Sequence, residues 1–292
     1  MSVLIALAAA LASACGFAFS TSLQHRVAGT APPSVRGSAQ LLRYLVTKPL
    51  WVVGFLLSGG ALVFHAFALH LAPIALVQPI MIGGVVLAVL VRAGLDRRLP
   101  SANEVIAVSV TALGIVAFVV TTDPTDTNSS IHGRDGIVLT LACLVVAGGV
   151  AAGASRLRSR NRQALSLGAC VGVLFGLTAG LTKIVAGQFA SDGIENALLS
   201  WPIYALVVAG AFAIVVNQRA YRIAPLSMSL PMINVVDVAG AVLFGLVVLG
   251  EVPAHNPLAV ATQAAAVVAM LVGLWLIARA ASKRVKTRAG AT

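Results

Sequence analysis

Residues 224–251 read APLSMSLPMINVVDVAGAVLFGLVVLGE, and this stretch decides the fold. It is almost wholly apolar and exceeds the ~20 residues that a helix needs to cross a bilayer. One acid, Asp237, lies near its middle. A similar segment occurs earlier in the chain: Ala72–Pro79 reads APIALVQP and Ala224–Pro231 reads APLSMSLP. The two segments are offset by 152 residues (224 − 72). The sequence therefore predicts a membrane protein built from a repeat.

The composition favours lipid as the solvent. Hydrophobic residues make up 59% of the 292 residues and charged residues only 10%, whereas soluble domains average about 25% charged residues. The net charge is +11, but the basic residues lie between apolar runs, which indicates contact with anionic membrane lipids and no nucleic-acid binding. The cysteines, Cys15, Cys143 and Cys170, lie inside apolar runs without ligand spacing, so we expect packing residues and no metal site or cofactor.

Apolar runs bounded by charges or prolines predict an all-α, polytopic bundle of about nine transmembrane helices, with room for a tenth. The segment 38–46, between the first two helices, is predicted to lie in the membrane interface. The predicted spans are 3–23, 49–69, 73–95, 104–121, 135–154, 164–189, 200–218, 225–249 and 257–278.

The basic residues predict the orientation of these helices. Of the 20 Lys and Arg residues, all except Arg134 and Lys183 fall in alternate loops or in the C-terminal tail. Since cytoplasmic loops carry the excess of Lys and Arg, we expect the N-terminus outside, the C-terminus in the cytoplasm, and a multi-pass protein of the cytoplasmic (inner) membrane.

The repeat predicts the organisation of the chain. The second, third and fourth helices match the seventh, eighth and ninth, the first matches the sixth, and the fifth has no second copy. The charge bias places 65–79 outside and 217–231 in the cytoplasm, so the copies are inverted, as is typical of secondary transporters. We expect a first repeat (1–155), a basic connector (156–162), a second repeat (163–279) and a basic tail (280–292).

Two charged residues inside predicted helices are candidates for a substrate or ion pathway. Asp237 lies about 14 residues from each of the flanking charged residues, Arg222 and Glu251, which is ~21 Å along a helix axis and near the bilayer midplane. An acid there should face the bundle interior, as a proton or cation site or as a hydrogen-bonded structural residue. Lys183 lies near the outer end of the sixth helix, where it would either contact an anion or an acid, or extend to the headgroups.

Uncharged polar residues complete the predicted pathway. His65 and Asn217 occupy matching positions of the repeat and are either functional or interhelical hydrogen-bonding groups. Proline frees backbone carbonyls that can line a cavity, so polar residues beside the duplicated prolines are included. These are Gln78, Ser227 and Asn234.

Two further patterns concern packing. Glycines recur every four residues from Gly168 to Gly180, a ridge that suits close helix packing within the bundle and would also suit a homodimer. Trp51 and Trp201 begin predicted helices and are expected to be interfacial anchors.

The segments FHAFALHLAPIALVQP (64–79) and VLGE (248–251) resemble those of the drug/metabolite transporter superfamily, which includes EamA-type exporters. Within it, the nine-helix layout, the segment STSLQHR (20–26) and Lys183 are most similar to NIPA-type magnesium transporters and their bacterial relatives. The magnesium-type pattern has an acid and an asparagine where this chain has Leu62 and His65. Glu251 also lacks an acidic counterpart, because Arg98 is nearest to that position in the first copy.

The resemblance implies a secondary transporter that moves a small molecule by alternating access, and not an enzyme. Two alternatives remain open. A NIPA-type divalent-cation transporter would need several oxygen ligands, and a membrane scaffold for envelope-lipid assembly would use its basic face to bind lipid.

Overall fold

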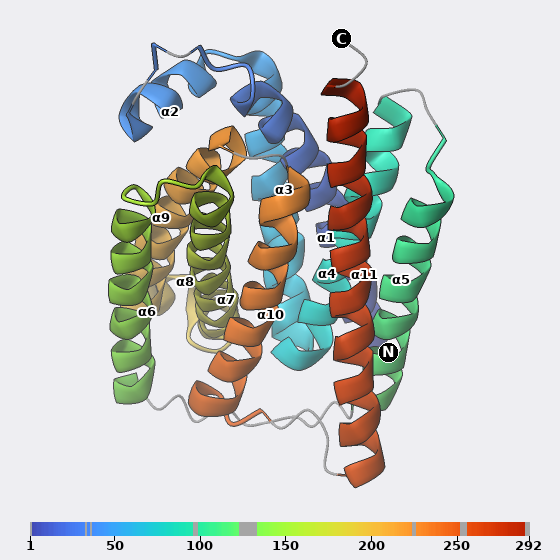
Figure 1. Cartoon of the computed structure of the whole chain (residues 1–292). Helices are drawn as coiled ribbons and strands as arrows, with labels where there is room; N and C mark the ends of the chain where they lie inside the picture. The colour runs from blue at the N-terminus through green and yellow to red at the C-terminus, as the bar shows by residue number, and fades with distance from the viewer. Residues whose placement is uncertain are drawn as a thin grey trace.

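The computed structural model describes residues 2–32, 34, 35, 37–95, 99–122, 133–223, 226–251 and 256–289. Ala224 and Pro225, half of the repeated Ala-Pro motif, lie outside these residues. All regular structure in the described ranges is helical (Figure 1). The helices are α1 (Ser2–Ala28), α2 (Ser38–Val46), α3 (Pro49–Leu71), α4 (Ile74–Leu95), α5 (Ala102–Thr121), α6 (Gly133–Ala154), α7 (Arg160–Ser191), α8 (Gly193–Leu199), α9 (Trp201–Ile223), α10 (Leu226–Val248) and α11 (Pro257–Ala289).

The long helices have the length and composition of membrane spans. Seven of them, α1, α3, α5, α6, α7, α9 and α11, are apolar enough to cross a bilayer, and α4 and α10 contain shorter apolar segments, Ile74–Gly84 and Met232–Val248. Large apolar side chains cover the outside of the bundle, with Leu4 71%, Val63 69% and Leu258 74% exposed. Such a surface is stable only against lipid, so this is a membrane-embedded helical protein.

Most predicted helix boundaries agree with the structure to within a few residues, and the segment 38–46, predicted only to lie in the membrane interface, forms the helix α2. Three differences stand out. α7 begins at Arg160 and so includes the end of the predicted connector, and α11 continues through the predicted tail to Ala289. Neither added segment contains Gly or Pro, so nothing in it breaks a helix. The unexpected α8 is a seven-residue helix that starts at Gly193, where φ is +79°.

The helices pack in two similar groups (Figure 1). α1 packs against α3 and α4, and α7 packs against α9 and α10. Between the groups, α5 contacts α11, α4 contacts α10, α3 contacts α7 and α1 contacts α9. α6 packs mainly against α7. Figure 1 shows α2 at one end of the bundle, where α11 also ends, and α1 starts toward the opposite end.

The glycine ridge brings α7 and α10 into close contact. A Cβ atom added at Gly172 would lie 2.6 Å from the Ile233 carbonyl oxygen, and one at Gly176 would lie 2.7 Å from the Asp237 carbonyl oxygen. A Cβ atom at Gly180 would overlap the ring of Phe244. The predicted role of the ridge in packing within the bundle is thus confirmed at these three glycines.

Candidate functional site

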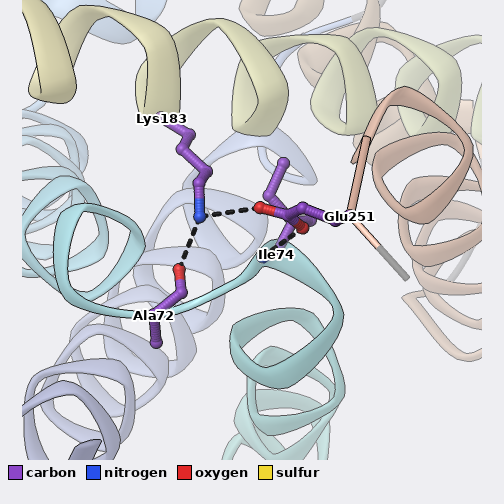
Figure 2. Close-up of polar contacts among 4 residues, drawn as sticks. All are labelled: Ala72, Ile74, Lys183 and Glu251. Carbon is purple, nitrogen blue, oxygen red and sulfur yellow. Dashed lines mark hydrogen bonds and ion pairs between the residues drawn. The ribbon is translucent and has the colours of Figure 1, made fainter. Parts of the chain in front are cut away.

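A buried ion pair joins α7 to the end of α10. The Lys183 Nζ atom lies 2.7 Å from the Glu251 Oε1 atom, and the side chains are only 16% and 4% exposed. The contact has the geometry of an ion pair and not of a well-directed hydrogen bond. Each partner also binds the junction between α3 and α4, as Figure 2 shows. Lys183 donates to the Ala72 carbonyl oxygen (2.8 Å), and Glu251 Oε2 accepts from the Ile74 amide (2.8 Å).

Each charge lies at the helix end that suits its sign. Ala72 follows the last residue of α3, where carbonyl groups lack partners within the helix and the helix dipole is negative. Ile74 begins α4, where amide groups are free and the dipole is positive. The ammonium of Lys183 therefore complements one helix end and the carboxylate of Glu251 the other. We call these four residues, Ala72, Ile74, Lys183 and Glu251, the charged cluster.

Two glycines of α10 and its C-terminal turn position Glu251. Gly250 has a φ of +65°, a conformation that only glycine adopts without strain. The turn allows the Glu251 amide to donate to the Gly245 carbonyl oxygen (3.0 Å). The Glu251 Oε2 atom then lies 3.0 Å from the place that a Cβ atom of residue 245 would occupy. The carboxylate therefore folds back over α10 because Gly245 has no side chain.

Of the two interpretations of Lys183, the structure favours the contact with an acid. Its ammonium points inward to Glu251 and does not extend along the helix to the bundle end. Glu251 was recognised as the end of the repeat motif but was not among the predicted pathway residues. Two features of the sequence could have identified it: Glu251 is a single acid directly after a glycine that ends a helix, and Lys183 is a single lysine inside another apolar helix.

Asp237 lies in the middle of α10, on the part of that helix that packs against α7. Its Oδ1 atom is buried and has no hydrogen-bond partner among the described residues. Its main-chain nitrogen and carbonyl oxygen lie close to Gly172 and Gly176 respectively. Because α7 has no side chain at Gly172 and Gly176, the backbones of α7 and α10 are in direct contact beside Asp237.

The remaining predicted residues lie on different helices. His65 on α3 is 7% exposed, faces Phe17 at a centroid distance of 6.5 Å, and its Nδ1 atom has no partner among the described residues. Asn217 on α9 is 8% exposed with its Oδ1 atom equally unpartnered. Gln78 is buried in α4, Asn234 is half-buried on α10, and the Ser227 side chain lies outside the described residues.

A second polar cluster, not predicted from the sequence, lies at the α2 end of the bundle. Gln24 Nε2 donates to the hydroxyl groups of Ser20 (2.8 Å) and Ser58 (2.9 Å). Gln218 Nε2 donates to Gln24 Oε1 (2.7 Å), and Trp51 Nε1 donates to Gln218 Oε1 (3.4 Å). We call these five residues the amide cluster. The prediction that Trp51 anchors in the interface is wrong, since the ring is 4% exposed and bound to Gln218.

No group of three or more His, Cys, Asp or Glu residues that could hold a metal ion occurs in the described part of the chain. The buried Cys170 donates to the Ala147 carbonyl oxygen (3.2 Å), as expected for a packing residue.

The chain is similar to an uncharacterized protein of Corynebacterium glutamicum, with 28% identity over 250 residues, which are 85% of this chain and 86% of that protein. No family model and no solved structure matches the chain.

Proposed function

We propose that this protein is a secondary transporter similar to the drug/metabolite transporter superfamily and moves a small molecule across the cytoplasmic membrane by alternating access. In this proposal α1, α3, α4, α5, α6, α7, α9, α10 and α11 span the bilayer. The N-terminus is outside, and the α2 end of the bundle, with the C-terminus, is cytoplasmic.

The exchange symmetry of the helix contacts carries the proposal. If α1, α3, α4 and α5 are exchanged with α7, α9, α10 and α11, nearly every main contact maps onto another observed contact. The α1 contacts with α3 and α4 become those of α7 with α9 and α10, and the α4–α10 and α5–α11 contacts map onto themselves. Only α6 has no counterpart, as the sequence repeat predicts. Two such halves can exchange conformations, which opens one central site to either side in turn.

Asp237 supplies the chemistry of the proposed central site. A buried carboxyl group in lipid needs a proton, a cation or a hydrogen-bond donor, and its Oδ1 atom has no protein partner among the described residues. The backbone of Asp237 lies in the close contact between α7 and α10, so a shift between these helices would change the surroundings of its carboxyl group. This supports a role in coupling a proton or a cationic group to transport.

Proteoliposomes with an internal pH dye test the function. A panel of small molecules is added outside under an imposed pH gradient, and magnesium uptake is measured in parallel to test the divalent-cation alternative. We expect proton movement coupled to at least one small molecule, abolished in Asp237→Asn and preserved in the control Asp192→Asn, an exposed acid between α7 and α8. Unchanged coupled flux in Asp237→Asn refutes the site. Magnesium flux alone refutes the assignment of a small molecule as the substrate, and no flux with stable co-purification of an envelope-assembly protein refutes the transporter assignment.

A further inference from the structure

We propose that the charged cluster and the amide cluster are the two gates of the transport pathway, the charged cluster on the outer side and the amide cluster on the cytoplasmic side. This inference rests on the proposed function. It assigns the parts of the chain that must separate for each side to open.

Both clusters join the same two groups of helices. In the charged cluster, Lys183 on α7 and Glu251 after α10 bind Ala72 and Ile74, which belong to the α1–α5 group. In the amide cluster, Gln218 on α9 binds Gln24 on α1 and Trp51 on α3. Each cluster therefore makes two hydrogen bonds between the groups, and a relative rotation of the groups must break them.

The clusters lie at opposite ends of the bundle. α3 starts beside α2 with Trp51 in its first turn and ends at the junction that binds Lys183. The 23 residues of α3, at 1.5 Å per residue, separate these ends by ~35 Å. Asp237 lies between them on α10, eight residues (245 − 237) and ~12 Å before Gly245, over which the Glu251 carboxylate folds back. A site at Asp237 thus has one cluster on each side of it.

The chemistry of both clusters suits groups that separate and re-form. The bonds that these clusters make between the groups are polar, so water can replace them when a gate opens, whereas a closed gate satisfies the same groups internally. The Gln24 side chain illustrates the closed state, with two bonds to serines and one to Gln218. The bonds from Lys183 and Glu251 likewise go to main-chain atoms at helix ends.

Cysteine labelling in oriented vesicles tests the gates without a known substrate. Cys15, Cys143 and Cys170 are replaced by alanine, and one reporter is introduced at each end. The outer reporter is Ala75→Cys, 3% exposed beside Ile74, and the inner reporter is Ala28→Cys, fully buried in one apolar cluster with Trp51. A membrane-impermeant maleimide is applied to right-side-out and to inside-out vesicles, and initial labelling rates are measured.

The gates are weakened one at a time by Glu251→Gln and by Gln24→Ala. Weakening the outer gate is expected to raise labelling of the outer reporter by ~10-fold and to lower labelling of the inner reporter, because one equilibrium links both ends. Weakening the inner gate is expected to do the reverse. If a single variant fails to insert, the double variant Lys183→Met/Glu251→Gln, or Gln218→Leu, replaces it.

The alternatives give distinct results. Faster labelling of both reporters in the same variant would mean that the cluster is a structural brace, and unchanged labelling would mean that it restrains nothing; either result overturns the proposal. Reciprocal labelling in a protein that transports nothing in liposomes would leave the gates standing and remove the transporter assignment. Coupled flux without reciprocal labelling would support the transporter assignment and overturn the proposed gates.

Discussion

Removing one charge of the Lys183–Glu251 pair should destabilise the protein far more than removing both. Breaking a buried pair by removing one partner typically costs about 3–5 kcal/mol, because it leaves an uncompensated charge. For Glu251→Gln we expect the lower end, about 3 kcal/mol, because the Lys183 side chain is 16% exposed and water can reach it. For Lys183→Met we expect about 4 kcal/mol, since the 4% exposed carboxylate stays buried and the Ala72 carbonyl oxygen loses its donor.

The double variant Lys183→Met/Glu251→Gln should cost only about 1–2 kcal/mol, since replacing a buried pair by neutral groups is often close to neutral and only the main-chain bonds weaken. The three values together give a coupling energy of about 5 kcal/mol or more. The assay is equilibrium unfolding in mixed micelles by a denaturing detergent, followed by circular dichroism. Additive effects of the two single substitutions would refute the pair as a coupled unit.

The exchanged pair Lys183→Glu/Glu251→Lys separates charge pairing from the helix-end contacts. If only the pairing of opposite charges mattered, the stability of the exchanged variant would recover to near that of Lys183→Met/Glu251→Gln. The structure instead predicts a further loss of about 1–2 kcal/mol relative to that variant, because the exchange places a carboxylate at the C-terminus of α3 and an ammonium at the N-terminus of α4. Full recovery would contradict the assigned role of the helix ends.

Three further substitutions test the packing, the turn and the amide cluster by the same unfolding assay. Gly176→Ala should lower the free energy of unfolding by about 1–3 kcal/mol, because its Cβ atom would overlap the α10 backbone. The control Gly187→Ala, on the same helix with no heavy atom within 4 Å of the added Cβ atom, should not destabilise the protein. Equal effects of the two substitutions would contradict the packing role of the glycine ridge. Gly250→Ala should cost about 1 kcal/mol because φ is +65° there, and no loss would mean that the turn is not needed. Gln24→Leu should lower the free energy of unfolding by about 1–3 kcal/mol, because it leaves buried polar groups unpaired. The control Ser22→Ala should cost less, because it removes only a hydrogen bond within its own helix. A smaller loss for Gln24→Leu than for Ser22→Ala would refute the stabilising role of the amide cluster.

The sequence was sufficient for the helices because each long helix is an apolar run with clear borders. It distinguished 38–46, the segment that forms α2, from the rest of its connection, and it predicted the close packing at Gly172, Gly176 and Gly180. The sequence was less successful where a helix continues because no helix-breaking residue is present. The basic segments 160–162 and 279–289 were interpreted as loops from their charge, although charge does not end a helix that lacks Gly and Pro.

The candidate site was predicted only in part, because it depends on contacts between distant residues. Lys183 was identified as an unusual charge in an apolar helix, but its partner is 68 positions away (251 − 183). The sequence predicted that the Ala72-Pro73 motif is part of the repeat. That the Ala72 carbonyl oxygen accepts a hydrogen bond from Lys183 became evident only from the packing of the helices. Trp51 was misassigned for the same reason, since a tryptophan at a helix start suits the interface unless a neighbouring helix supplies a buried acceptor such as Gln218.

The repeat also explains why the two ends of the bundle differ in chemistry. The junction between α3 and α4 accepts an ammonium and a carboxylate, and the sequence repeats this junction at Ala224-Pro225. In the first copy, however, the position nearest to that of Glu251 holds Arg98. A basic residue cannot cap a helix N-terminus as a carboxylate does, so the charged cluster cannot be reproduced at the α2 end. In the proposed gates the α2 end uses other groups, since the neutral amides of Gln24 and Gln218 bind each other without requiring opposite charges. In the proposed inverted repeat, the two halves therefore share their helix arrangement and differ at a few polar positions, which makes the two ends chemically distinct.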